Sequence, residues 1–187
     1  MARTSDANRD CARVAILGKH GTGDIVNIRP ATHEDDPFLR EMLYEAAAWN
    51  SDWPRERMIA ALADPMLERY HRDWGREGDA GVIAELDREP VGSAWYRLFT
   101  AEQPGYGFVD EKTPELGLAV VPLHRRKGIG HTLLRALMVQ AHEDGFQALS
   151  LSVAVHNRSR MMYERAGFER VREEAEGESW VMRAELG

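Results

Sequence analysis

Apolar residues return at helical spacing in several stretches of the chain. The clearest stretch is 128–144, where apolar residues from Ile129 to Ala141 share one face and Gly145 follows as a typical helix stop. This pattern predicts a long amphipathic helix. Further helices, three of them opening at or beside a proline and the last one ended by Gly167, are predicted at 36–49, 54–63, 65–74 and 159–166.

Segments rich in β-branched and aromatic residues separate these helices and predict strands. A hairpin turn is expected at 87–89 and longer loops at 75–79 and 100–114. The order of elements, with three helices after the first strand and a strand–helix–strand–helix run later, predicts a mixed α/β (α+β) sheet with helices on both faces. The predicted strands cover 24–28, 82–86, 91–99, 115–121, 148–155, 168–173 and 179–185.

The length of 187 residues is that of one domain. The first 24 residues contain few apolar positions, so we expect 1–24 to be a disordered or loosely attached arm and 25–187 to form a single domain. The string GKHGTG at 18–23 is similar to a phosphate-binding loop. It lacks the spacing in which four residues separate the first glycine from Gly-Lys and a hydroxyl residue, so it does not predict nucleotide binding.

Charge and composition exclude several classes of protein. Lys and Arg total 24 against 31 Asp and Glu, and this net charge of −7 argues against a nucleic-acid partner. The single cysteine, Cys11, excludes a disulfide framework and a multi-cysteine zinc site, and we expect no metal. No apolar run approaches the roughly 18 residues of a membrane span, so no membrane partner is expected. We therefore expect a cytoplasmic location, and the sequence leaves a homodimer as one possible oligomeric state.

A basic, glycine-containing segment precedes the predicted helix at 128–144. In RRKGIG, Gly128 and Gly130 let an anion approach the backbone closely, and the first N–H groups of the helix have no internal partners. The helix dipole and the cations Arg125, Arg126 and Lys127 add positive potential. The segment is therefore either an anion cradle suited to a pyrophosphate or a basic surface turn.

A second motif follows at a fixed distance. The run from Asn157 to Phe168, NRSRMMYERAGF, combines with RRKGIG to resemble the GNAT superfamily of acyl-CoA-dependent N-acetyltransferases. The segment IRPAT at 28–32 is similar to the first strand of that family, so the resemblance spans about 25–185; Arg160 stands where the family often has alanine. The resemblance implies a mostly antiparallel mixed sheet of about six or seven strands, splayed between its fourth and fifth strands.

The same resemblance implies acetyl-CoA as co-substrate. The pyrophosphate would lie on the cradle, and the pantetheine arm would pair with the backbone of the strand at 115–121. Asn157 would either hydrogen-bond the pantetheine or cap the helix that follows it. The implied cofactor-binding residues are Leu118, Ala119, Val120, Arg125, Arg126, Lys127, Gly128, Ile129, Gly130, His131 and Asn157.

Acyl transfer to an amine also needs a base and an acid. Tyr163 matches the tyrosine of the family and would protonate the leaving thiolate; the alternative is a core aromatic residue packed near Phe168. Glu115 would act as the base, directly or through water, unless it is a solvent-exposed carboxylate at the end of a strand. The weaker candidates for the base are Asp110, Glu111 and His156.

The sequence predicts the acceptor of the acyl group less specifically than the donor. The resemblance implies a small-molecule or peptide amine, and Trp49, Trp53 and Tyr106 are candidates for its binding site, although aromatic residues are more often part of a core. Two alternatives remain: a non-catalytic module that binds acyl-CoA for regulation, and a transferase for a longer acyl donor.

Overall fold

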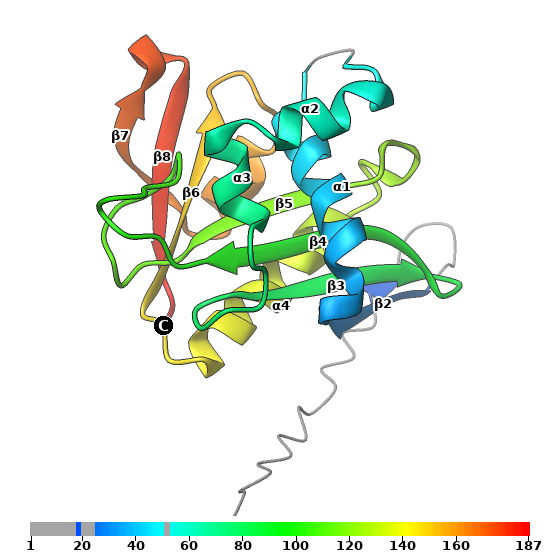
Figure 1. Cartoon of the computed structure of the whole chain (residues 1–187). Coiled ribbons are helices and arrows are strands. Elements are labelled where there is room, and N and C mark those ends of the chain that lie inside the picture. Colours follow the sequence, from blue (N-terminus) through cyan, green and yellow to red (C-terminus); the bar gives the residue numbers. More distant parts are fainter. Residues whose placement is uncertain (1–17, 20–24, 51–52) are drawn as a thin grey trace, which may run out of the picture.

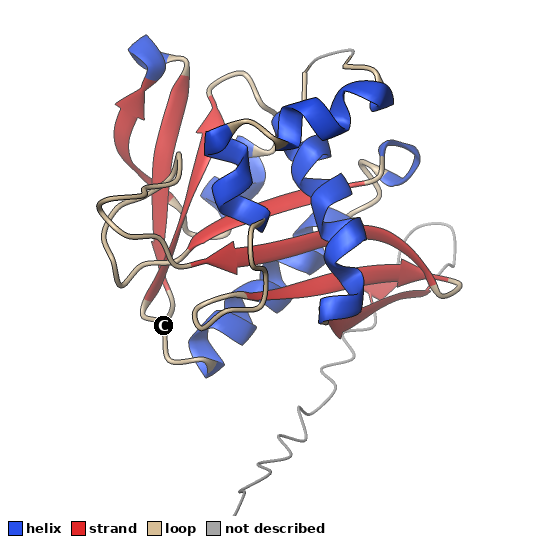
Figure 2. Cartoon of the chain, in the orientation of Figure 1, coloured by secondary structure: helices blue, strands red, loops and turns tan. Residues whose placement is uncertain are grey.

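Figure 1 shows the computed structural model, which describes residues 18–19, 25–50 and 53–187. Most of the predicted arm over 1–24 lies outside the described residues, apart from the two-residue strand β1 (Gly18–Lys19), which pairs with β2. From residue 25 onward, the described α-helices and strands follow one another in the order predicted from the sequence (Figure 2).

A single mixed sheet runs through the described part of the chain. Its strand order is β1-β2-β3-β4-β5-β6-β8-β7, and every neighbouring pair is antiparallel except β5 and β6, which are parallel. The remaining strands are β2 (Ile25–Pro30), β3 (Ala80–Leu86), β4 (Glu89–Arg97), β5 (Glu115–Val120), β6 (Ala148–Ala154), β7 (Glu169–Glu174) and β8 (Ser179–Glu185).

Helices cover both faces of this sheet, which confirms the predicted fold class. Figure 1 shows α1 and α3 in front of the sheet and α4 behind it. The front layer contains η1 (His33–Asp35), α1 (Asp36–Ala47), η2 (Arg55–Arg57), α2 (Met58–Leu62) and α3 (Pro65–His71). The other elements are η3 (Pro122–His124), α4 (Ile129–Glu143), α5 (Arg160–Arg165) and η4 (Ala175–Gly177).

Two buried clusters follow from this layering. Leu133, Leu134 and Leu137 of α4 are fully buried against apolar side chains of the sheet. On the other face, Leu39 and Met42 of α1 pack with a cluster that includes Trp95 of β4. The apolar stripe predicted for the helix at 128–144 is therefore the surface that joins this helix to the sheet.

The ends of several elements differ from the sequence prediction. The predicted helix at 54–63 begins with the 3-10 turn η2, and α1 ends two residues before the predicted Trp49. The turn between β3 and β4 consists of two residues, Asp87 and Arg88, both with positive φ (49° and 71°). It is one residue shorter than the predicted turn at 87–89, because Glu89 already belongs to β4. Gly145 and Gly167 have φ of 91° and 92°, as expected for the residues that end α4 and α5.

The sheet splits between β5 and β6, which are the fourth and fifth strands of the family pattern. Their pairing is confined to Glu115 opposite Ser150, beside which the Ser150 N–H donates to Pro114 O at 2.9 Å. Beyond this point each strand has one edge without a partner strand. The predicted splay is therefore confirmed, and its apex lies at Glu115.

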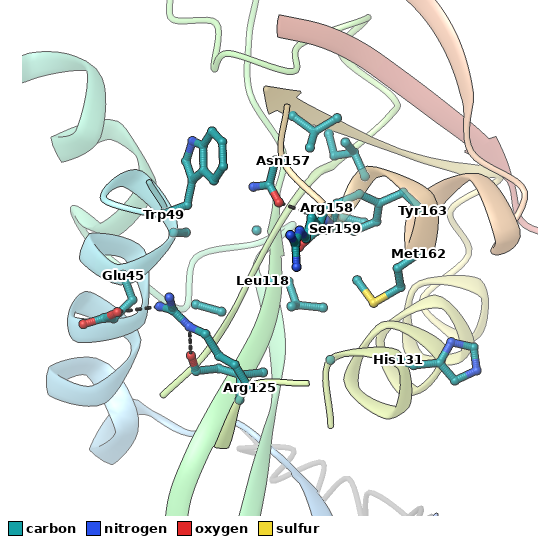
Figure 3. Close-up of a pocket in the computed structure, with 18 of the residues that line it drawn as sticks. Glu45, Trp49, Leu118, Arg125, His131, Asn157, Arg158, Ser159, Met162 and Tyr163 are labelled. Atoms are coloured by element: carbon teal, nitrogen blue, oxygen red, sulfur yellow. Dashed lines mark hydrogen bonds and ion pairs between the residues drawn. The ribbon is translucent and has the colours of Figure 1, made fainter. Parts of the chain in front are cut away.

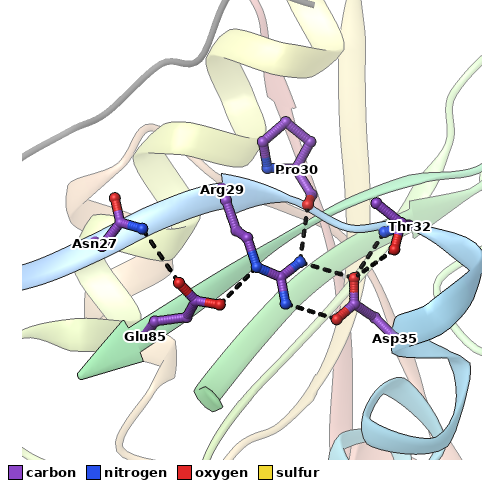
Figure 4. A network of polar contacts seen from close by, with 6 residues as sticks. All are labelled: Asn27, Arg29, Pro30, Thr32, Asp35 and Glu85. Carbon is purple, nitrogen blue, oxygen red and sulfur yellow. Dashed lines mark hydrogen bonds and ion pairs between the residues drawn. The ribbon is translucent and has the colours of Figure 1, made fainter. Parts of the chain in front are cut away.

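Arg29 anchors the first long strand to its surroundings (Figure 4). Its guanidinium donates to both carboxylate oxygens of Asp35 at 2.7 and 2.8 Å, and its Nε donates to Glu85 of β3 at 2.6 Å. The Arg29 guanidinium holds the pKa of the Asp35 carboxyl below its ordinary value. Asp35 also accepts the Thr32 N–H at 2.8 Å, so this network fixes the passage from β2 into α1.

None of the helices that the structure describes combines the length and the apolar character needed to cross a membrane.

Candidate active site

A cleft of about 830 Å³ opens where β5 and β6 separate (Figure 3). A volume of this size suits a small molecule or a cofactor. The walls come from elements far apart in the sequence: the end of α1, the free edge of β5, the turn before α4, the middle of β6 and the segment around α5. The lining residues are Glu45, Ala46, Trp49, 116–120, Arg125, Arg126, Gly128, Gly130, His131, 151–153, 156–159, Met162, Tyr163 and Arg165.

The turn before α4 presents backbone N–H groups at one end of the cleft. Arg126 and Gly128 have positive φ (61° and 84°), and Gly128 is the residue that caps α4. The first backbone bonds of the helix run from His131 and Thr132 to Gly128 O, at 3.1 and 3.2 Å. Among the described residues, the N–H groups of Ile129 and Gly130 have no backbone acceptor. This geometry is a place where an anion can accept several N–H bonds.

Arg125 joins two walls of the cleft (Figure 3). Its Nε donates to Val120 O at 2.9 Å, and its guanidinium pairs with Glu45 of α1 at 2.6 Å. The charge of Arg125 is thus balanced within the protein. Its main effect is to fix the turn before α4 against β5 and α1, whereas Arg126 and Lys127 are exposed.

The free edge of β5 presents alternate backbone groups to the cleft. The Val121 N–H donates to Val91 O at 2.9 Å, so the backbone groups of Val121 and, two residues earlier, Ala119 are directed at β4. Those of Leu118 and Val120 face away from β4, toward the cleft. Of the three strand residues predicted to pair with pantetheine, Ala119 therefore lines the cleft without offering its N–H or C=O.

Asn157 lies at the cleft wall and begins the turn into α5. Its Oδ1 accepts the Ser159 N–H at 2.9 Å in an Asx turn that leads into α5; the N-cap residue of the helix is Ser159, so Asn157 does not itself cap it. The side-chain NH₂ group keeps both donors for another partner. One end of the amide therefore serves this turn, and the other end is available to a ligand.

Tyr163 lies on α5 and also lines the cleft. Its ring packs edge-on against Phe168, with centroids 5.9 Å apart, which is the packing that the sequence offered as the alternative to a catalytic role. No described residue hydrogen-bonds its hydroxyl, yet that oxygen is not among the buried unpartnered atoms, so it reaches the cleft surface. Burial raises the pKa of the Tyr163 hydroxyl above its ordinary value, which keeps the group protonated at neutral pH.

Glu115 lies at the apex of the splay but is covered by the 100–114 loop. Its side chain is buried; Oε1 accepts the Tyr70 hydroxyl at 2.7 Å, and Oε2 is buried without a partner. The Tyr70 oxygen in turn accepts the Tyr106 N–H at 2.6 Å, and a Cβ added to Gly105 would lie 2.2 Å from Glu115 Oε2. Burial raises the pKa of the Glu115 carboxyl to about 7, although the Tyr70 hydrogen bond acts in the opposite direction.

Glu115 should make the protein less stable as the pH rises. Its folded pKa of about 7 exceeds the value of 4.5 for an unperturbed carboxyl, so the folded state holds the proton more tightly. The stability from this group is complete below pH 4.5 and lost as the pH passes about 7. The total is about 3 kcal/mol at about 1.4 kcal/mol per pKa unit.

Urea unfolding of the wild type and Glu115→Gln at pH 5 and pH 8 measures this effect. Between pH 5 and pH 8, the free energy of unfolding of the wild type should fall, relative to that of Glu115→Gln, by most of this total of about 3 kcal/mol, at about 1.4 kcal/mol per pKa unit. A difference in stability that does not change with pH would show that Glu115 has an ordinary pKa.

The other predicted residues are only partly brought together. Trp49, Gly128, Gly130 and His131 line the cleft, as does His156, whereas Lys127 and Ile129 do not, and Ile129 is buried in the core. Trp53 lies against Tyr44 and under the Arg57 guanidinium, and Tyr106 stacks on Tyr70. Asp110 and Glu111 accept backbone N–H groups within the 100–114 loop.

Several cleft residues were not predicted from the sequence. Glu45 reaches the cleft only through packing of α1 against β5, and no local pattern identifies it. The sequence could have indicated that Arg158, Met162 and Arg165 lie together, because their spacing of four and three residues places them on one side of a helix. Tyr70, the partner of Glu115, is 45 residues away from it in the chain.

Comparisons with known proteins identify the family to which this splayed sheet belongs. The profile of the Acetyltransferase (GNAT) family matches residues 39–168, well over half of the 187-residue chain. The chain therefore belongs to this family, and the resemblance seen in its motifs is confirmed. No match is found among curated proteins.

Solved structures show the same architecture. The GNAT domain of S. lividans PAT is similar with a TM-score of 0.65 at 19% identity, covering 90% of this chain and 95% of that one. The PaiA N-acetyltransferase of Thermoplasma acidophilum in complex with coenzyme A is similar with a TM-score of 0.61 at 20% identity, covering 86% of this chain and 98% of that one. The structure of yncA of Salmonella typhimurium with its cofactor acetyl-CoA is similar with a TM-score of 0.60 at 18% identity, covering 87% of this chain and 94% of that one. At these identities the likeness establishes the fold.

Proposed function

We propose that this protein transfers an acetyl group from acetyl-CoA to a primary amine of a small molecule or peptide. The observation that carries the proposal is the cleft itself. One continuous space joins the exposed N–H groups before α4, the free edge of β5 and the hydroxyl of Tyr163. These are the three features that a pyrophosphate, a pantetheine arm and a leaving thiolate require, in that order along the donor.

The donor would be held mainly by the backbone. The N–H groups of Ile129 and Gly130 and the cation Arg126 would bind the pyrophosphate, and Lys127, which lies outside the cleft lining, would add positive potential from the neighbouring surface. The pantetheine amides would pair with Leu118 and Val120, as an added strand would, and with the side-chain NH₂ of Asn157. The Val120 C=O is already bound by Arg125, so its N–H is the group that remains for the donor.

The chemistry follows from which groups are free to act. An alkylamine with a pKa near 10.4 is mostly protonated at pH 7 and must lose a proton before it attacks the thioester carbon. The amine forms the new C–N bond, the carbonyl oxygen takes on negative charge beside an N–H of β5, and the C–S bond then breaks. The CoA thiolate leaves and gains one proton, which balances the proton that the nitrogen gives up as the amide forms; the earlier proton, lost from the ammonium form before attack, passes through the base to solvent.

Tyr163 would serve the departing sulfur. A thiol has a pKa of about 8.5, below that of a phenol, so complete transfer from tyrosine to thiolate is uphill. As a general acid, Tyr163 would instead share its proton with the sulfur while negative charge develops in the transition state, before a free thiolate forms. A hydroxyl that stays protonated and reaches the cleft is suited to this role.

Two residues compete for the role of base. Glu115 has a pKa of about 7 and a partner-free oxygen, but Gly105 and Gly107 of the 100–114 loop pack against its carboxylate and it does not line the cleft. His156 is exposed and lines the cleft. We propose Glu115, acting through water. Glu115→Gln should abolish the acidic limb of the pH–rate profile, and His156→Gln should preserve it; the reverse outcome would assign the base to His156.

Saturating acetyl-CoA should raise the melting temperature. A ligand at 100 times its Kd stabilises the native state by about 2.7 kcal/mol, which corresponds to roughly 5–10 °C for a chain of this size. Differential scanning fluorimetry with acetyl-CoA, with acetate plus ADP as the control, measures the shift. The absence of a shift, together with no heat in calorimetry, would contradict the proposed function.

A screen of amines with acetyl-CoA, reading the released thiol, tests turnover. Thiol release that depends on both substrates supports the transferase. Binding without release under any amine would instead support the non-catalytic acyl-CoA module. The same screen with a longer acyl-CoA tests the donor, because the proposal requires acetyl-CoA to be the better substrate.

A further inference from the structure

We infer that Tyr70 is a positioning residue for acetyl transfer, because its hydroxyl fixes the Glu115 carboxyl and the 100–114 loop in one arrangement at the apex of the splay. The inference rests on the proposed function, since it concerns the residue proposed as the base. It goes further by assigning a role to a side chain of α3, a helix that contributes no residue to the lining of the cleft.

The hydroxyl of Tyr70 lies between a carboxylate and a backbone N–H. It donates to Glu115 Oε1 at 2.7 Å and accepts the Tyr106 N–H at 2.6 Å. The ring packs edge-on against Phe99, with centroids 4.9 Å apart, and is stacked on the Tyr106 ring. Burial raises the pKa of the Tyr70 hydroxyl well above its ordinary value, so the group remains a hydrogen-bond donor at neutral pH.

A buried arginine of β4 fixes the helix that carries this hydroxyl. The Arg97 guanidinium donates to Arg69 O at 2.5 Å and to Arg72 O at 2.8 Å, which are carbonyl groups at the end of α3. Its charge is balanced by Asp79, at 2.5 Å. Arg97 also stands opposite Glu115 in the β4–β5 ladder, so one residue connects the end of α3 to the strand pair that carries the carboxyl.

Two glycines of the loop lie directly on the carboxyl. A Cβ added to Gly105 would lie 2.2 Å from Glu115 Oε2 and 2.6 Å from the Tyr70 oxygen, and a Cβ added to Gly107 would lie 2.9 Å from Glu115 Cδ. Contacts this short leave no space for a side chain at either position. The carboxyl and the hydroxyl are therefore held together by the backbone that covers them.

The loop is held from both halves of the split sheet. Arg69 of α3 donates to Pro104 O at 2.8 Å, and Arg172 of β7 donates to Phe108 O at 2.7 Å. The positive charge of Arg172 favours the ionised carboxyl from a distance. The other charged groups of the surrounding segments bind partners within their own segments; they are Asp110, Glu111 and Arg183.

The bond from Tyr70 favours the form of Glu115 that a base requires. Among the described residues, Tyr70 is the only side chain that hydrogen-bonds this carboxylate. Burial raises the pKa of the Glu115 carboxyl to about 7, and the Tyr70 hydrogen bond acts against that rise. A base must be ionised before it accepts a proton, so the hydroxyl keeps Glu115 active at a lower pH than burial alone would allow.

Single-turnover pH–rate profiles of Tyr70→Phe, with the acceptor found in the amine screen, test the inference. The acidic limb should move up by about one pH unit, the size expected for a hydrogen bond to a charged group. The rate on that limb should fall about tenfold and recover at higher pH, with acetyl-CoA affinity unchanged. The matched control is Tyr96→Phe, which removes a tyrosine–carboxylate bond to Asp144 outside the cleft lining and should leave the limb in place.

A second substitution separates positioning from damage to the packing. Site-specific 3-fluorotyrosine at position 70 keeps the ring and makes its hydroxyl a stronger donor, so the limb should move to lower pH, opposite to the shift in Tyr70→Phe. Urea unfolding as a function of pH gives a measurement without substrates. The pH at which stability falls should rise in Tyr70→Phe and decrease with 3-fluorotyrosine.

Three results would overturn the inference while leaving the proposed function intact: a limb that stays in place in Tyr70→Phe, a rate that falls equally at every pH, or shifts of the same sign in both substitutions. Each would reduce Tyr70 to a packing residue of α3. If the wild type transfers acetyl to none of the amines, the proposed function fails, and the inference fails with it.

Discussion

Tyr163→Phe should slow acetyl transfer by about 10²–10⁴-fold, the usual contribution of general acid catalysis. The variant keeps the ring and its edge-on contact with Phe168, and it removes a hydroxyl that no described residue hydrogen-bonds. Stability should therefore change by less than about 1 kcal/mol, the net value of one hydrogen bond. Acetyl-CoA affinity should stay nearly the same, because the loss concerns charge that develops only as the C–S bond breaks.

Single-turnover kinetics with the acceptor found in the amine screen provides the measurement. Steady-state turnover alone is not sufficient, since product release often limits the rate of such enzymes. Calorimetry with acetyl-CoA serves as the control for binding. An unchanged rate of acyl transfer would remove Tyr163 from the mechanism and leave it as a core residue, with solvent as the source of the proton.

Gly130→Leu should weaken CoA binding by about 10²–10⁴-fold, because it would cover two or more N–H donors, each worth about 1.5–3 kcal/mol to a charged acceptor. A Cβ at Gly130 would meet Leu118 Cδ2 at 3.5 Å and Met162 Sδ at 3.6 Å, both of them cleft residues. A larger side chain must therefore enter the cleft. Folding should be preserved, since Gly130 lies at the cleft surface in the first turn of α4.

Gly130→Ala is the matched control for this variant. Those contact distances are ordinary van der Waals contacts, so the methyl group fits, and alanine favours helix by up to about 1 kcal/mol relative to glycine. CoA binding should fall far less than in Gly130→Leu, while thermal unfolding shows equal or higher stability. Equal losses of affinity in the two variants would mean that close approach of the phosphates to this backbone is not what binds the donor.

The sequence motif placed Arg125 correctly near the cleft but did not predict its contacts. The sequence predicted a cation near the pyrophosphate, because Arg125 opens the glycine-containing segment. In the structure its guanidinium is committed to Glu45 and to Val120 O, so it braces the cleft. Glu45 is 80 residues earlier in the chain, and no local pattern connects the two.

The protonation of Glu115 also depends on contacts that the local sequence does not reveal. Its position at the start of a strand suggested either an exposed carboxylate or a base. Burial under the 100–114 loop, the hydrogen bond from Tyr70 and the unpartnered Oε2 set its pKa near 7. None of these causes is local, since the desolvation of a carboxylate depends on whatever packs over it.

The sequence by itself determined the elements and the family. The stripe from Ile129 to Ala141 and the glycines at 145 and 167 are local signals, because a helix and its cap involve residues within a few positions of one another. The tertiary structure decided the rest: the parallel pairing of β5 and β6 at one residue pair, the cleft beyond it, and the approach of Met162 to the start of α4. Strand order and cleft walls depend on contacts between residues far apart in the chain. The periods of 3.6 and 2 carry no information about which distant surfaces meet, so only packing of the whole chain selects them.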